Sequence, residues 1–313
     1  MVVTGALISA LLVSPAAMWV ARRTGLVDRP GPLKVHAKPV PYLGGLAVAA
    51  GLAWGVGATR PSLLVPLGAA LALGIFDDAT DLSPLSRLIG ELTIGAAVGV
   101  CLPLGDQRVV GVVFAALVTL VLCNGVNMID GLDGLAGGTA VVAALGFYVV
   151  LTGDGATIAI ALAAGLAAFL VFNLPPARMY LGDGGAYLAG TALAALFLLA
   201  CRSGSGVSFG GAALLVGYPV VELVFTVVRR GVQRKSPLKG DRHHVYDQLH
   251  ARGASTSMAA LACVAFQAVL VSVAIAVAPR SATAGLVVAC VCGMMILVAG
   301  YLTGFLAPRT RRS

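Results

Sequence analysis

The stretch GVVFAALVTLVLCNGVNMIDGLDG, from Gly111 to Gly134, shows what kind of chain this is. It is apolar up to Cys123, as expected of a segment inside a membrane. Polar residues then recur at every third position, at Asn124, Asn127, Asp130 and Asp133. Asp-Gly pairs are common turn signals, but a plain turn between membrane helices needs neither two asparagines nor this regular spacing. We therefore interpret the cluster as functional, with groups suited to bind a base, a sugar or a metal ion.

The composition of the whole chain agrees with a membrane protein. Of 313 residues, 59% are hydrophobic and 11% are charged, against about 25% charged in a typical soluble domain. This excludes a soluble enzyme, a secreted disulfide scaffold and a disordered tail. Apolar stretches near span length predict an all-α polytopic integral membrane protein with about 11 transmembrane helices in a single domain, 1–313. The predicted spans are 2–21, 42–59, 62–76, 86–104, 109–123, 134–152, 155–173, 185–201, 209–228, 257–278 and 281–307.

Basic residues divide unevenly between the two sets of loops. Seventeen of the 21 lysines and arginines fall in one set and four in the other. Because basic loops stay cytoplasmic, we expect the N-terminus outside and the C-terminus inside, in the cell membrane. Most acidic residues lie on the same side, which predicts one active site facing the cytoplasm. In the longest loop, lipid headgroups are the expected contacts of Arg229, Arg230, Arg234 and Lys235.

A second acidic cluster, FDDATDLSP, ends the third predicted span. Asp77 and Asp78 each lie about one helical turn from Asp81, so the three carboxylates are expected to converge. The alternative is a solvated helix end. Acids at a helix C-terminus oppose its dipole, however, and they repel one another unless a cation lies between them. An oxygen-preferring ion such as Mg²⁺ suits them, and Ser83 and Pro84 predict the start of the next helix.

Two further segments carry groups suited to phosphates. In YLGDGG, Asp183 lies among glycines at the start of a predicted span. It is either an N-cap or the ligand of an ion that neutralises a phosphate held against glycine backbone. In DRHHVYD, Arg242 and His244 can donate charge-assisted hydrogen bonds to phosphate oxygens. Both segments lie on the predicted cytoplasmic side.

These four segments, in this order and on one predicted face, resemble the polyprenyl-phosphate N-acetylhexosamine-1-phosphate transferase family. The resemblance begins at VDRPGPLKVHAKPVPYLGG, residues 27–45, and its span count is similar to the GlcNAc branch rather than the MurNAc-pentapeptide branch. The histidine motif departs from the HxHH of relatives, so only His244 aligns. The resemblance implies catalytic roles for Asp77, Asp78 and Asp183, with Asp78 and Asp183 as metal ligands. It implies substrate contacts at Lys34, Arg87, Asn124, Asn127, Asp130, Asp133 and His244.

The reaction that the resemblance implies is attack of a polyprenyl-phosphate oxygen on the sugar-proximal phosphorus of a UDP-sugar, with release of UMP. Mg²⁺, or Mn²⁺ in its place, is the implied cofactor, and UDP-GlcNAc is the expected donor. A MurNAc-pentapeptide donor and a catalytically silent paralogue are alternatives. A secondary transporter would want ionisable groups near the bilayer midplane, where only Glu91 and Glu222 fall. The expected partners are the UDP-sugar, polyprenyl phosphate, membrane lipid and a second copy in a homodimer, with no nucleic acid.

Overall fold

The computed structural model describes residues 1–29, 39–202, 207–234, 243–277 and 281–306. Within these ranges the chain is a bundle of α-helices with one antiparallel two-stranded hairpin, so the predicted all-α class is confirmed. The elements in chain order are α1 (Val2–Thr24), β1 (Val27–Asp28), β2 (Val40–Pro41), α2 (Gly44–Thr59), η1 (Pro61–Leu63), α3 (Leu64–Thr80), α4 (Pro84–Cys101), α5 (Arg108–Ile129), α6 (Leu135–Val150), α7 (Gly153–Asn173), α8 (Gly182–Ala200), α9 (Phe209–Leu215), α10 (Gly217–Val232), α11 (Val245–Ala251), α12 (Thr256–Val277) and α13 (Ala282–Leu302).

The helices have the lengths and the polarity of membrane spans. Among the described residues, eight helices are long and apolar enough to cross a membrane, and α9 with α10 makes a ninth if the bent pair is one span. Two further apolar helices, α2 and α6, are shorter. The predicted spans fall on these helices, which confirms a polytopic membrane protein. The number of crossings and the orientation stay predictions.

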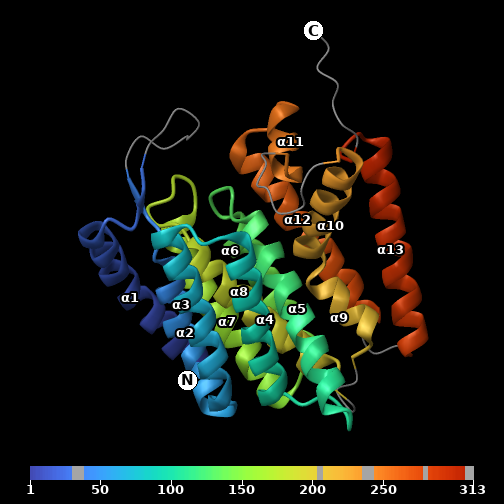
Figure 1. Ribbon diagram of the computed structural model, residues 1–313, viewed down its shortest axis with the longest axis horizontal. Coiled ribbons are helices and arrows are strands. Elements are labelled where there is room, and N and C mark those ends of the chain that lie inside the picture. The colour runs from blue at the N-terminus through green and yellow to red at the C-terminus, as the bar shows by residue number, and fades with distance from the viewer. Residues whose placement is uncertain (30–38, 203–206, 235–242, 278–280, 307–313) are drawn as a thin grey trace.

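Helix α8 forms the centre of the bundle, with 94% of its 18-residue apolar window buried. Helices α2, α3 and α5 pack around it (Figure 1). Glycines allow close approach, since a Cβ on Gly190 would lie 2.6 Å from the Cα of Cys123 on α5. A Cβ on Gly45 of α2 would lie equally close to the Cα of Gly185. Because Asp183 lies in the first turn of α8, this packing places it relative to three other helices.

The predicted span 209–228 is wrong in one respect, because it consists of two helices. Helices α9 and α10 meet at an angle of 81°. Pro219 has no N–H to donate to the carbonyl of Leu215, as a continuous helix requires. The side chain of Gln267 on α12 replaces the lost bonds. Its Nε2 donates to the Leu215 oxygen at 2.6 Å, and its Oε1 accepts from the Tyr218 N–H at 2.8 Å. The break is therefore satisfied inside the bundle.

Candidate active site

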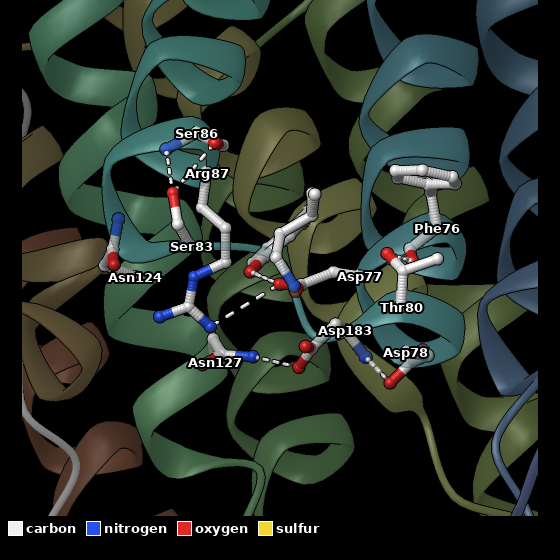
Figure 2. Close-up of polar contacts among 12 residues, drawn as sticks. Phe76, Asp77, Asp78, Thr80, Ser83, Ser86, Arg87, Asn124, Asn127 and Asp183 are labelled. Carbon is white, nitrogen blue, oxygen red and sulfur yellow. Dashed lines mark hydrogen bonds and ion pairs between the residues drawn. The ribbon is translucent and has the colours of Figure 1, made fainter.

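Asp77, in the last turn of α3, is held by donors from three parts of the chain. It is 4% exposed. Its Oδ2 accepts a hydrogen bond from the Tyr187 hydroxyl at 2.8 Å and faces the Arg87 guanidinium, whose Nη1 is 3.4 Å away. Its Oδ1 accepts from the Leu82 N–H at 2.9 Å. Figure 2 shows Arg87 extending from α4 toward this carboxylate. The structure therefore brings Asp77 and Arg87 together.

Asp78, the next residue of α3, caps helix α8. Its Oδ1 accepts from the Asp183 N–H at 3.2 Å, and its Oδ2 accepts from the Gly184 N–H at 3.4 Å. A carboxylate at a helix N-terminus is stabilised by the free N–H groups and by the helix dipole. Gly74 permits this approach, because a Cβ there would overlap the backbone of Asp183 and Gly184. Asp183 is therefore not the N-cap of α8, a position that Leu181 occupies, and the side chain of Asp78 caps the helix instead.

Asp183 is the third carboxylate of the cluster. The Nδ2 of Asn127 on α5 donates to its Oδ1, and its carboxyl group lies within hydrogen-bonding reach of Asp77. Figure 2 shows Asp183 between Asn127 and Asp78. The prediction that Asp81 completes this cluster is wrong. The chain leaves the helix there in the left-handed conformation, with φ 55°, and the residue is exposed. Helix α8 therefore supplies the carboxylate that was expected from Asp81.

Asn124 lies one turn before Asn127, because α5 continues to Ile129 rather than ending at 123 as predicted. Its Nδ2 donates to Glu91 Oε2 on α4 and to the Leu120 oxygen at 2.9 Å. Glu91 is 1% exposed. The amide nitrogen of Asn124 therefore joins α4 to α5.

The turn after α5 carries Asp130 and Asp133 and is bonded to the loop before α8. Asp130 accepts from a backbone N–H at the start of α8, and Asp133 Oδ2 accepts from the Ala177 N–H at 2.9 Å. Burial raises the pKa of Asp130 well above its usual range, and the negative charges of Asp183 and Asp78 raise it further. Both predicted residues therefore lie beside the carboxylate cluster and tie its loops together.

Two tyrosines lie next to these acids. The rings of Tyr42 and Tyr180 have centroids 6.3 Å apart, with their planes at 42°. The Tyr180 N–H donates to the Pro41 oxygen at 2.8 Å, which joins the β1–β2 hairpin to the segment before α8. Burial, together with the negative charges of Asp133 and Asp28, raises the pKa of Tyr180 to about 12. The β1–β2 hairpin therefore lies next to the candidate site.

His244 is held by residues outside the carboxylate cluster. Its Nδ1 bonds to Glu222 Oε1 on α10 at 2.9 Å, and its ring stacks on Tyr246 with centroids 5.4 Å apart. The Tyr246 hydroxyl donates to the Met128 oxygen at 3.2 Å. Because Met128 lies between Asn127 and Asp130, α11 is docked on the end of α5 that carries the polar cluster. Figure 1 shows α11 at the end of the bundle opposite the N-terminus.

Comparison with known proteins gives several GlcNAc-1-phosphate transferases among the proteins similar to this chain. The chain is 31% identical over 252 residues to the undecaprenyl-phosphate alpha-N-acetylglucosaminyl 1-phosphate transferase of Thermotoga maritima, covering 78% of this chain and 80% of the relative. It is 29% identical to a probable undecaprenyl-phosphate N-acetylglucosaminyl 1-phosphate transferase of Bacillus subtilis, with 82% and 78% covered. It is also 29% identical to the decaprenyl-phosphate N-acetylglucosaminephosphotransferase of Mycolicibacterium smegmatis, with 82% and 77% covered.

The chain belongs to the polyprenyl-phosphate N-acetylhexosamine-1-phosphate transferase family. The sequence model of glycosyl transferase family 4 matches residues 61–201. That region carries all three clustered carboxylates together with Arg87 and both asparagines. Glu222 and His244 lie beyond it. The residues that match the family model therefore include the three carboxylates that the structure brings together.

Some residues next to the carboxylates were not predicted from the sequence. Tyr187 lies one turn after Asp183 on the same helix, and that spacing is the signal that points to it. Arg229 and Arg230 were expected to contact lipid headgroups, and this interpretation is wrong, since they are 2% and 4% exposed. Both lie in the last turn of α10, within the bundle. Two predicted site residues, Lys34 and Arg242, lie outside the described residues.

The carboxylate cluster can supply some of the ligands of a magnesium ion, while substrate phosphates supply others. Among the described residues, no three His, Cys, Asp or Glu side chains are grouped as ligands of one ion. Asp77 and Asp183 nevertheless lie within hydrogen-bonding reach, and two carboxyl groups that close need a proton or a cation between them. Mg²⁺ is commonly held by one or two carboxylates together with substrate phosphates. Such a ligand set suits this site.

Proposed function

We propose that the protein transfers GlcNAc-1-phosphate from UDP-GlcNAc to a polyprenyl phosphate. The observation that carries this is the convergence of Asp77, Asp78 and Asp183 with Arg87, in a chain whose relatives carry the names given above. An oxygen of the polyprenyl phosphate forms a bond to the sugar-proximal phosphorus. The bond from that phosphorus to the UMP oxygen breaks, and UMP leaves with the electron pair. The products are UMP and a polyprenyl-diphosphate-linked sugar.

The side chains supply charge and orientation for this transfer. Both reactants are anions, and they repel until cationic groups neutralise them. Asp183 and one neighbouring aspartate, Asp77 or Asp78, would hold Mg²⁺ together with substrate phosphates, and the ion would supply part of that neutralisation when bound. Asp77 holds the guanidinium of Arg87 at the cluster. Phosphoryl transfer requires mainly positioning and electrostatic stabilisation from the protein, which is what this set of groups provides.

The remaining predicted residues are assigned to the donor. Asp133 is assigned to the uracil, and Asn124, Asn127 and Asp130 to the rest of the nucleotide and the sugar. The basic contacts of the donor are assigned to Lys34, Arg242 and His244. The excess of basic residues in one set of loops supports placing this site at the cytoplasmic face of the cell membrane.

The test follows UMP release by purified protein in detergent with undecaprenyl phosphate, Mg²⁺ and a panel of UDP-sugars. UMP is expected with UDP-GlcNAc and should disappear when EDTA is added. Asp183→Asn should abolish turnover, whereas the matched change Asp154→Asn should not. Asp154 pairs with Arg60 at 2.8 Å and lies in the first turn of α7, about 28 Å along that helix from Asn173 at the site end.

Release of UMP only with UDP-MurNAc-pentapeptide would refute the assigned donor. Folded protein that releases no UMP from any sugar would refute the transferase activity and favour a silent paralogue.

A further inference from the structure

Glu222 is a buried acid to which the transfer reaction above gives no role. It lies on α10 and is 0% exposed. A buried carboxylate is costly unless donors surround it. Its Oε1 and Oε2 accept from the Val245 N–H at 3.2 and 3.1 Å, and its Oε1 also bonds to His244 Nδ1 at 2.9 Å. These partners are the N-cap and the first residue of α11, so Glu222 holds the start of that helix.

The surroundings of His244 leave one edge of its ring for a ligand. Its Nδ1 faces Glu222 and, at 3.5 Å, the Thr226 hydroxyl. One ring face stacks on Tyr246, while the backbone N–H donates to Asp247 at 3.2 Å. Among the residues that the structure describes, the hydrogen bonds of the ring all use Nδ1. When one imidazole nitrogen is held by a carboxylate, the tautomer and the direction of the other nitrogen are set.

We infer that Glu222 is a positioning residue, which holds Nδ1 of His244 so that Nε2 meets the diphosphate of the donor. The inference rests on the proposed function. Tyr246 places this ring beside the polar end of α5 through its bond to Met128. The same carboxylate anchors the Val245 N–H, so it sets both the direction of the ring and the place of α11.

Other polar groups packed near Glu222 do not replace it at Nδ1. Arg229 on the same helix donates to Thr226 at 3.5 Å. Tyr218 of α10 and Cys263 of α12 lie near enough for the charge of Glu222 to act on them. The shortest bond to the ring is nevertheless that of Glu222, and it comes from a carboxylate.

The experiment measures KM for UDP-GlcNAc and for undecaprenyl phosphate separately in E222Q, H244A and the double variant. E222Q should raise the donor KM about tenfold or more, as expected for loss of a charge-assisted hydrogen bond, and leave the acceptor KM unchanged. The double variant should be no worse than H244A, because Glu222 acts through His244. Asp154→Asn, the same carboxylate-to-amide change at the distant end, should leave both KM values unchanged.

A purely structural role would give a different pattern. Additive losses in the double variant, equal rises in both KM values, or a wild-type donor KM in E222Q would overturn the inference. If E222Q does not fold, E222D tests the same point, since it keeps the carboxylate and should recover part of the donor affinity. Calorimetric binding of UDP-GlcNAc without acceptor separates the two proposals. Binding that E222Q weakens supports the inference even without turnover, and wild-type protein that binds no UDP-GlcNAc overturns both.

Discussion

The Tyr187→Phe substitution tests the arrangement around Asp77 with little change in packing. Tyr187 is 2% exposed, and its hydroxyl donates to Asp77 Oδ2 at 2.8 Å. Phenylalanine fills nearly the same volume but removes this bond; among the described residues, Asp77 keeps Leu82, Arg87 at 3.4 Å and the nearby carboxyl group of Asp183. A hydrogen bond to a charged group contributes about 1.5–3 kcal/mol. If the whole of this free energy serves to orient Asp77 for turnover, kcat should fall roughly 10- to 150-fold when the bond is lost.

The assay is UMP release at saturating UDP-GlcNAc and undecaprenyl phosphate. Tyr148→Phe is the matched control, because Tyr148 is exposed on α6 and should tolerate loss of its hydroxyl. Gel filtration in detergent shows whether each variant stays folded. A folded Tyr187→Phe protein with wild-type kcat would refute the view that this hydroxyl orients Asp77 for the reaction.

Three further predictions concern the same end of the molecule and the broken helix. Asp78→Asn should abolish UMP release in folded protein, because it removes one of the three clustered charges; near-normal turnover would contradict its assignment. Gln267→Leu should lower the free energy of unfolding by about 2–6 kcal/mol, since two buried backbone groups lose partners, and an unchanged thermal midpoint in detergent would oppose this. EDTA should stop turnover and Mg²⁺ or Mn²⁺ should restore it, while activity that survives chelation would argue against a metal-dependent site.

The helices could be predicted because hydropathy alone determines which segments enter a membrane. The spans were located to within a few residues for most helices, including the start of α4, where Ser83 accepts from the Ser86 N–H as an N-cap. The break between α9 and α10 was missed because its partner is distant in sequence. Pro219 favours a kink, but the partner of the freed backbone groups is Gln267, 48 positions later.

The sequence indicated several of the residues that the structure brings together, but not how they are arranged. Local spacing indicated that Asp77, Asp78 and Asp81 converge, because i,i+3 and i,i+4 neighbours share a helix face. The helix ends at Thr80, so that rule stops applying at Asp81. Asp183 takes the third place through the packing of α8 against α3, and no local pattern contains that contact.

The acids inside the spans bear on the rival hypothesis of a transporter. Such a protein would use intramembrane carboxylates to bind its cargo. Here Glu91 accepts from Asn124, and Glu222 is bonded to His244 and to the start of α11. The broken helix has a similar explanation, since Gln267 satisfies the break and α10 then carries Glu222 to α11. The buried acids and the broken helix, which a transporter would also have, are therefore explained by contacts that position Asn124 and His244. This favours the transferase.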